Sequence, residues 1–127
     1  MTPAGIVTEF PIPTPGSNPV SIVAGTDGAL WFAESNTDKI ARVTTAGTVT
    51  EFAIPTTPSS PTSLTVGSDS NIWFTEYAAS AIGRIDKSGV VTEFPVPADP
   101  KGIARGPDGN LWFTEQQAGK IGRFLPP

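Results

Sequence analysis

The sequence predicts an all-β protein, a β-propeller with three four-stranded blades in the chain. The first observation is a unit of about 42 residues that occurs three times. Val-Thr-Glu-Phe begins at residues 7, 49 and 91, and Trp-Phe-x-Glu begins at residues 31, 73 and 112. The second is that the apolar segments are short and bounded by turn residues, and the third is that none keeps the 3.6-residue period of a helix. Short strands that recur every 40–45 residues or so are typical of propeller blades.

The second repeat shows the expected order of elements. Strands are predicted at residues 61–67, 71–76, 81–85 and 90–97, with turns at 68–71 and 86–89. At the first of these turns the other repeats have Asp-Gly, a pair favoured in tight hairpins. The fourth strand contains proline in every repeat. Because proline cannot donate a hydrogen bond to a neighbouring strand, we expect the fourth strand to be the outermost of each blade and the first to be the innermost.

The repeats also predict how the chain is organised. Residues 1–127 are expected to form a single propeller segment, with repeats at about 14–55, 56–97 and 98–127 and a separate outer strand at 6–13. We expect this N-terminal strand to act as the outer strand of a last blade, that of another copy. Propellers usually have about 4–8 blades, so three blades do not close a ring.

Two interpretations follow from the incomplete ring. In the first, the chain associates with itself, and a homodimer of six blades is favoured over a homotrimer of nine. In the second, the chain is a part, natural or engineered, of a longer propeller.

Composition excludes several classes of partner and site. The 127 residues have a formal net charge of −4 with both signs interspersed, so no nucleic acid is expected as a partner. No apolar run reaches the ~20 residues of a membrane helix, and no membrane partner is expected. The chain has no histidine and no cysteine, which removes the commonest general base and the commonest zinc ligands. The first residues lack the pattern of a signal peptide, which favours a cytoplasmic location.

A longer motif resembles a known family. Residues 106–115 are Gly-Pro-Asp-Gly-Asn-Leu-Trp-Phe-Thr-Glu, residues 120–123 are Lys-Ile-Gly-Arg, and residues 91–97 are Val-Thr-Glu-Phe-Pro-Val-Pro. This pattern resembles the virginiamycin B lyase family along the whole chain. The resemblance implies a seven-bladed propeller whose named member opens the lactone ring of streptogramin B antibiotics by elimination, using a histidine, a glutamate and a magnesium ion.

The position of the family's histidine is occupied by other residues in this chain. The resemblance places that histidine in a Pro-His-Gly-Ile run at the start of a blade's first strand. The three repeats have Val20, Thr62 and Lys101 there, and the nearest match is Pro-Lys-Gly-Ile at residues 100–103. We therefore expect no lyase catalysis and no cofactor, with magnesium as the alternative.

Residues that break the symmetry of the repeat are the candidates for ligand binding. Counting outward from the hairpin turn pairs Lys101 with Glu115 at one rim, close to the central channel, just as it pairs residue 20 with 34 and residue 62 with 76. Tyr77 and Arg105 also have no counterpart of their kind in the other repeats. The predicted ligand-binding residues are therefore Lys101, Glu115, Tyr77 and Arg105. The alternative is that Lys101 and Glu115 form a surface ion pair worth ~0–1 kcal/mol.

Acidic and aromatic residues that occur in all three repeats have two interpretations each. The glutamates that end the second strand are a candidate metal site, because carboxylate oxygens suit hard cations such as magnesium; they are Glu34, Glu76 and Glu115. Alternatively, each accepts hydrogen bonds from the backbone or from the arginine of its repeat. The glutamates of the outer strands are expected to be solvated. The tryptophans are expected to fill the gaps between blades, with stacking on a sugar as the alternative.

Together these observations predict a non-catalytic, self-assembling propeller module that acts as a scaffold or binds a small ligand at the mouth of the channel. The first alternative is an enzyme like the streptogramin B lyases, with a magnesium site. The second is a carbohydrate-binding lectin that uses the aromatic residues between blades.

Overall fold

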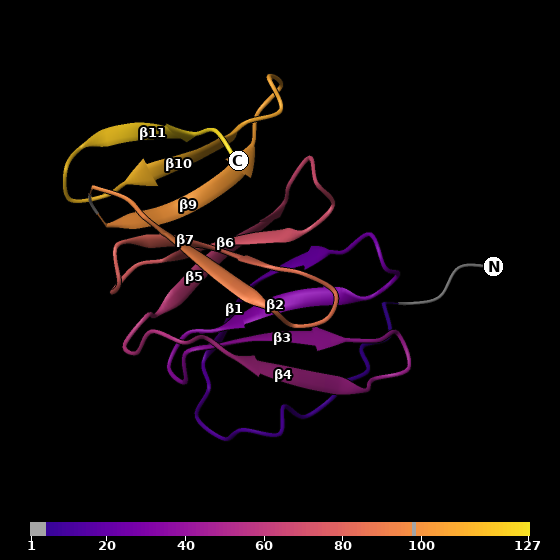
Figure 1. Ribbon diagram of the computed structural model, residues 1–127. Coiled ribbons are helices and arrows are strands. Elements are labelled where there is room, and N and C mark those ends of the chain that lie inside the picture. The colour runs from indigo at the N-terminus through magenta and orange to yellow at the C-terminus, as the bar shows by residue number, and fades with distance from the viewer. Residues whose placement is uncertain (1–4, 98) are drawn as a thin grey trace.

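The computed structural model describes residues 5–97 and 99–127, which form eleven strands and no helix. The strands make three antiparallel sheets, stacked one above another in Figure 1. The first sheet contains β1 (Pro19–Ala24), β2 (Leu30–Glu34), β3 (Lys39–Val43) and β4 (Val49–Ala53). The second contains β5 (Pro61–Val66), β6 (Ile72–Glu76), β7 (Ala81–Ile85) and β8 (Val91–Pro95). The third contains β9 (Pro100–Arg105), β10 (Leu111–Glu115) and β11 (Lys120–Phe124).

The order of strands in each sheet is that of a propeller blade. Consecutive strands are neighbours, so that β1 and β4 are the edges of the first sheet and β5 and β8 the edges of the second. The strands β1, β5 and β9 lie next to one another and are therefore the inner strands. The predictions of the fold class and of the strand order within a blade are confirmed. Within the part of the chain that the structure describes, no helix is long and apolar enough to cross a membrane.

The hairpin between the first two strands contains a bulge that the sequence did not reveal. Near the turn the pairing follows the expected register, with Ile22 opposite Phe32. An irregularity at Ser21, whose φ is 57°, then shifts the pairing by one residue, so that Glu34 lies opposite Pro19 rather than Val20. The other two blades shift in the same way, and Glu115 lies opposite Pro100 rather than Lys101. The predicted pairing of residues 20 with 34, 62 with 76 and 101 with 115 is therefore wrong by one residue, because one extra residue in the inner strand slips the register.

The aspartate of each hairpin turn ties three parts of its blade together. Asp27 Oδ1 accepts a hydrogen bond from the indole Nε1 of Trp31 at 3.4 Å, and its Oδ2 accepts one from Arg42 Nε at 2.8 Å. The second and third blades repeat both contacts, with indole distances of 3.0 Å and arginine–aspartate distances of 3.8 Å. The arginine of each repeat therefore partners the turn aspartate rather than the glutamate that ends the second strand.

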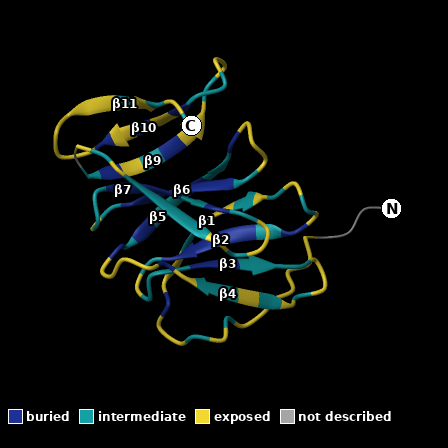
Figure 2. Ribbon diagram, in the orientation of Figure 1, coloured by how far each residue is buried: buried dark blue, intermediate teal, exposed yellow. Residues whose placement is uncertain are grey.

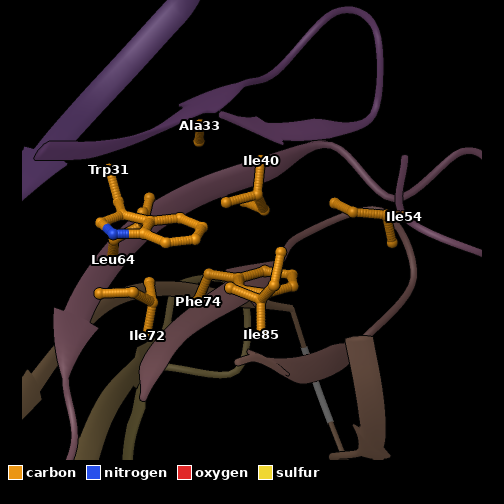
Figure 3. Packing of buried hydrophobic residues seen from close by; sticks show 8 residues of the cluster. All are labelled: Trp31, Ala33, Ile40, Ile54, Leu64, Ile72, Phe74 and Ile85. Atoms are coloured by element: carbon orange, nitrogen blue, oxygen red, sulfur yellow. The ribbon is translucent and has the colours of Figure 1, made fainter. Parts of the chain in front are cut away.

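The core lies between the blades, where one sheet packs face to face on the next. Trp31 from the first blade is 2% exposed and shares a buried cluster with Leu64, Ile72 and Ile85 of the second, and Figure 3 shows its ring above Leu64 and Ile72. Phe52 of the outer strand β4 stacks on the same indole, with ring centroids 5.8 Å apart. Trp73 plays the same part between the second and third blades. The expectation that these two tryptophans fill inter-blade gaps matches this packing.

The N-terminal segment differs from the expectation of a strand at 6–13. Residues 6–12 adopt no strand, and within the described residues β11 has no partner on its outer side. The ring of Phe10 instead lies directly against Gly47, in the turn between β3 and β4. The segment therefore lies against the first blade without joining its sheet. A strand needs a partner edge, and the described residues offer none beside this segment.

Candidate functional site

Two of the four predicted ligand-binding residues meet at the rim. The ammonium of Lys101, on β9, lies 5.4 Å from the centre of the Tyr77 ring, which follows β6. Gln117 Nε2 donates a hydrogen bond of 3.1 Å to the hydroxyl of Tyr77. This cluster of a cation, a phenol and an amide joins the second and third blades. Lys101 and Tyr77 have no counterpart of their kind in the other repeats, whereas Gln117 aligns with the amide Asn36 of the first repeat.

The other two predicted ligand-binding residues lie apart from this cluster. Glu115 is 8% exposed, and no ion pair joins it to Lys101 in residues 5–97 and 99–127. Arg105 is exposed at the opposite end of β9, beside Leu111. The structure therefore brings together Lys101 and Tyr77 but not Glu115 or Arg105. Gln117 was not among the residues predicted from the sequence. It lies one position after Gln116, the residue that aligns with Tyr77 in the repeat.

A pair of carboxyl groups lies inside the first blade. Glu34, fully buried at the end of β2, meets Glu51 of the outer strand β4. Burial is the main cause that raises the pKa of Glu34, to about 7, and the hydrogen bond and charge of Glu51 add to it. Burial opposes ionisation of Glu51 too, but hydrogen bonds from Glu34 and Thr14 and the charge of Lys39 lower its pKa. Below about pH 7 the pair therefore shares one proton between its two carboxyl groups.

The second blade repeats this pair without a nearby lysine. Glu76 is fully buried, and neither of its carboxyl oxygens has a hydrogen-bond donor in the described structure. Burial raises the pKa of Glu76 to about 8, and Glu93 of β8 and the charge of Asp38 raise it further. A protonated Glu76 can donate to Glu93, which removes the repulsion between the two groups. Glu51 and Glu93 are thus only partly exposed and lie beside the buried glutamate of their blade, so the expectation that they are solvated is wrong.

The carboxyl pairs explain why the glutamates do not form a common metal site. Each of Glu34 and Glu76 meets the outer-strand glutamate of its own blade, across the small residue at the middle of the third strand. Among the described residues, no group of three or more acidic side chains gathers closely enough to hold a metal ion. The structure therefore does not bring Glu34, Glu76 and Glu115 together. The signal for the pairs was present in the sequence, since both glutamates recur with the same spacing.

The face of the first blade that points away from the second is an open apolar socket. A pocket of about 310 Å³ lies there, between the blade and the N-terminal segment. Four of its lining residues occupy the repeat positions of residues in the second blade that surround Trp31: Ile22, Phe32, Val43 and Val49 correspond to Leu64, Phe74, Ile85 and Val91. The lining residues are Phe10, Ile12, Pro19, Val20, Ser21, Ile22, Phe32, Val43 and Val49.

The face of the third blade that points away from the second has the opposite shape. Trp112 is 38% exposed and Ile121 is 65% exposed. Their counterparts in the first blade, Trp31 and Ile40, are 2% and 0% exposed, because the second blade covers them. Figure 2 shows exposed residues, in yellow, along β10 and β11. We call Trp112, Thr114 and Ile121 the plug. The described residues therefore present an exposed apolar plug on the third blade and an open apolar socket on the first.

Comparison with known proteins identifies the family of the chain. The model of the virginiamycin B lyase family matches residues 1–126. The selenomethionine-substituted virginiamycin B lyase from Staphylococcus aureus is 40% identical, with a TM-score of 0.87 over 97% of this chain and 46% of that one. A catalytically inactive form of this lyase, with a histidine replaced by alanine, has been solved with quinupristin and matches to the same extent. A streptogramin B lyase is 39% identical, with a TM-score of 0.83 over 94% of this chain and 44% of that one.

The chain spans less than half the length of these lyases. A gluconolactonase from Xanthomonas campestris, 15% identical with a TM-score of 0.72, shares the fold alone.

Proposed function

Because the chain belongs to the virginiamycin B lyase family, we propose that it is a non-catalytic, self-assembling module that supplies three blades to a propeller ring of that kind. The ring acts as a scaffold, and its rim around Lys101 and Tyr77 is the place for a small ligand. The observation on which the proposal depends is the pairing of an exposed plug with an empty socket of matching residues.

The plug and the socket repeat an interface that the chain already contains twice. In both internal interfaces a tryptophan of one blade stacks on a phenylalanine of its own outer strand and packs on apolar residues of the next blade. The socket offers the same apolar wall, with Phe10 at the position of Phe52. Leaving an aromatic residue of this size half in water loses much of the free energy that its burial supplies inside the chain. A second copy seated on this face recovers it.

A ring of two copies agrees better than a ring of three with the usual number of blades in a propeller and with the length of the related lyase. The chain matches 46% of the length of the Staphylococcus aureus lyase, so two chains supply about as many residues as that lyase has. Six blades lie within the usual range of roughly 4–8, whereas nine do not. Each copy contributes one plug and one socket, so a head-to-tail dimer closes with every interface filled.

The absence of histidine supports a module without lyase activity. Replacement of a histidine by alanine accompanies the loss of catalysis in the inactive form of the Staphylococcus aureus lyase. The sequence of this chain contains no histidine at all, so an assembled ring also has none. The buried carboxyl pairs do not replace it, because both members lie inside a blade rather than in the rim cluster.

The molar mass in solution tests the assembly. Light scattering on the wild-type chain is expected to give twice the mass of one chain. Ile121→Arg places a charge in the plug and should give a single chain, since a buried unpaired arginine is costly. Val90→Arg is the matched control, because Val90 is 59% exposed in an outer turn of the second blade, and it should stay a dimer. A folded wild-type chain with the mass of one copy contradicts the assembly.

Quinupristin tests the absence of catalysis. Incubation of the chain with quinupristin and magnesium is expected to leave the antibiotic ring closed, as followed by mass spectrometry. Linearisation that disappears in Glu115→Ala would instead support the alternative, a lyase, which the 40% identity to virginiamycin B lyase favours. Calorimetric titration of the same compound into the wild type and into Lys101→Ala separates binding at the rim from chemistry.

A further inference from the structure

The third sheet has an unfilled edge where the other two sheets have a fourth strand. In the first blade β3 pairs with β4 along five residues, and in the second β7 pairs with β8 in the same way. The equivalent strand β11 pairs only with β10 in the described residues. Its backbone groups on the open side therefore have no partner strand, and an edge of this kind is a template for strand addition.

The N-terminal segment is placed as the outer strand of a missing neighbour blade. Phe10 lies against Gly47 of the first blade, and Phe52 of β4 lies in the same way against Gly89 of the second. The two phenylalanines belong to the same repeat motif. Residues 7–11 thus stand beside the first blade as β4 stands beside the second. The difference is that β4 is paired with the third strand of its own sheet, and residues 7–11 are paired with nothing described.

The segment does not lie beside its own chain's open edge. Phe10 contacts the first blade, whereas β11 belongs to the third, and the second blade lies between them (Figure 1). A second copy whose plug fills the socket, however, brings its own β11 to the place that β3 takes relative to β4. The same docking that buries Trp112 therefore also offers an edge to residues 7–11.

We propose that residues 7–11 add to β11 of a second copy as its fourth antiparallel strand, with Thr8 opposite Arg123 and Glu9 opposite Gly122. This strand addition rests on the self-association proposed above, and it specifies which residues of the two copies lie opposite one another. The register is that of Thr50 opposite Arg42 in the first blade and of Thr92 opposite Arg84 in the second.

The side chains on both faces of the added strand fit this register. On one face, Phe10 stacks on Trp112 of the second copy, as Phe94 stacks on Trp73 at 5.6 Å between ring centroids. On the other face, Glu9 meets the buried Glu115 of the second copy across Gly122, where glycine leaves the same room as Gly83. Pro11 falls opposite Lys120, at the outer position that Pro95 takes in β8. Proline is tolerated there because its missing N–H faces away from the sheet.

A disulfide between two introduced cysteines tests the register, because the wild-type chain contains no cysteine that could form another disulfide. Opposite residues on antiparallel strands come within reach of a disulfide. The variant Thr8→Cys with Arg123→Cys should form, under mild oxidation, a covalent species of twice the chain mass on a non-reducing gel. The matched control is Thr8→Cys with Lys120→Cys, which places the second sulfur three residues away and on the other face of the strand. It should link at least tenfold less.

The outcomes separate this inference from the self-association on which it rests. A covalent dimer from the first variant, but not from the control, supports the register. A disulfide within a single chain, or preferential linkage of the control, overturns it. If light scattering shows a wild-type dimer and the first variant stays unlinked, strand addition is wrong while self-association stands. If the wild type is a single chain, the self-association itself fails.

Discussion

The residue with the clearest chemistry is the buried glutamate that ends the second strand of each blade. In the first two blades it lies against a second glutamate, so that two negative charges would share a site with little water. Burial and the neighbouring carboxyl group raise the pKa of Glu34 and of Glu76, so that each retains a proton that it can donate to the other carboxyl group. Each of these two blades therefore contains a titratable group in its interior, apart from the rim cluster.

These pairs make the stability of the fold depend on pH. The pKa of Glu76 is about 8 in the fold, against 4.5 for an ordinary glutamate, so between these values the folded chain holds a proton that the unfolded chain has lost. Glu34, at about 7, acts in the same direction over a narrower range. Stability should therefore be highest near pH 5 and fall toward pH 8, by up to about 1.4 kcal/mol per pH unit and group. Glu51, whose pKa is lowered, acts in the opposite direction only below its ordinary value.

Urea unfolding of Glu76→Gln at pH 5 and pH 8 tests this dependence. The amide of glutamine can donate to Glu93 as a protonated glutamate does, but it does not ionise. The variant should be more stable than the wild type at pH 8, and it should lose less stability than the wild type between the two pH values. An equal loss in both proteins would show that the second-blade pair does not hold a proton.

A second prediction concerns the glycine beside this pair. A Cβ on Gly83 would collide with the ring of Phe74 and would lie 2.7 Å from Glu76 Oε2. Gly83→Ala is therefore expected to destabilise the chain by about 1–3 kcal/mol in thermal or urea unfolding, as overpacking of a core does. Gly102→Ala is the matched control, because the nearest atom to its Cβ would be 3.4 Å away, an ordinary contact. Similar losses in both variants would contradict crowding by Phe74 as the cause, since the lower backbone entropy of the unfolded alanine variants acts in the stabilising direction.

At the scale of the element, the sequence was sufficient wherever the repeat itself was the signal. The strands of the second blade, the outer position of β8 and the burial of Trp31 and Trp73 all followed from motifs that occur three times. The bulge in the inner strand was not predicted, although Gly102 stands at the equivalent position of the third blade, and a glycine inside a strand often marks a bulge. One slipped residue was enough to separate Glu115 from Lys101.

The candidate site was harder to predict than the fold because its contacts join different repeats. Lys101 on β9 of the third blade contacts Tyr77, which follows β6 of the second blade. A residue pattern within one strand cannot predict a contact between two blades. The carboxyl pairs likewise join strands that are not neighbours in the sheet, with the third strand between them. Their recurrence pointed to structure, but only the packing of the blade revealed which residues meet.

One buried hydroxyl group adds a hydrogen bond between the second and third blades. Thr75 Oγ1, fully buried on β6, donates to the carbonyl of Lys101 at 2.8 Å and accepts from the backbone N–H of Ser63 at 3.1 Å. Thr75→Val keeps the shape but leaves two partly buried backbone groups without these partners, at a cost of about 1–3 kcal/mol. Thr114→Val should cost less, since exposed Thr114 accepts one such bond and water can replace it. Equal losses in urea unfolding would contradict this role of Thr75.

At the scale of the whole molecule, the chain has two internal interfaces that are filled and two outer faces that are not. Each internal interface buries a tryptophan and the apolar residues around it, so folding and blade packing stabilise one another along the chain. The end blades lack one neighbour each, and their exposed residues include Trp112, Ile121 and Ile22. A second copy that covers these faces would add stability in the way that any ligand of the folded state does.

The thermal midpoint should therefore depend on protein concentration. In the proposed dimer, unfolding separates the copies, so a hundredfold rise in concentration should raise the midpoint by several degrees. The measurement is differential scanning fluorimetry across that range, with the combined emission of the three tryptophans as the signal. Ile121→Arg, which keeps both internal interfaces, should unfold at a lower temperature that is independent of concentration. A wild-type midpoint that stays constant would mean that the two outer faces remain in water in the folded state, and that three blades are stable without a closed ring.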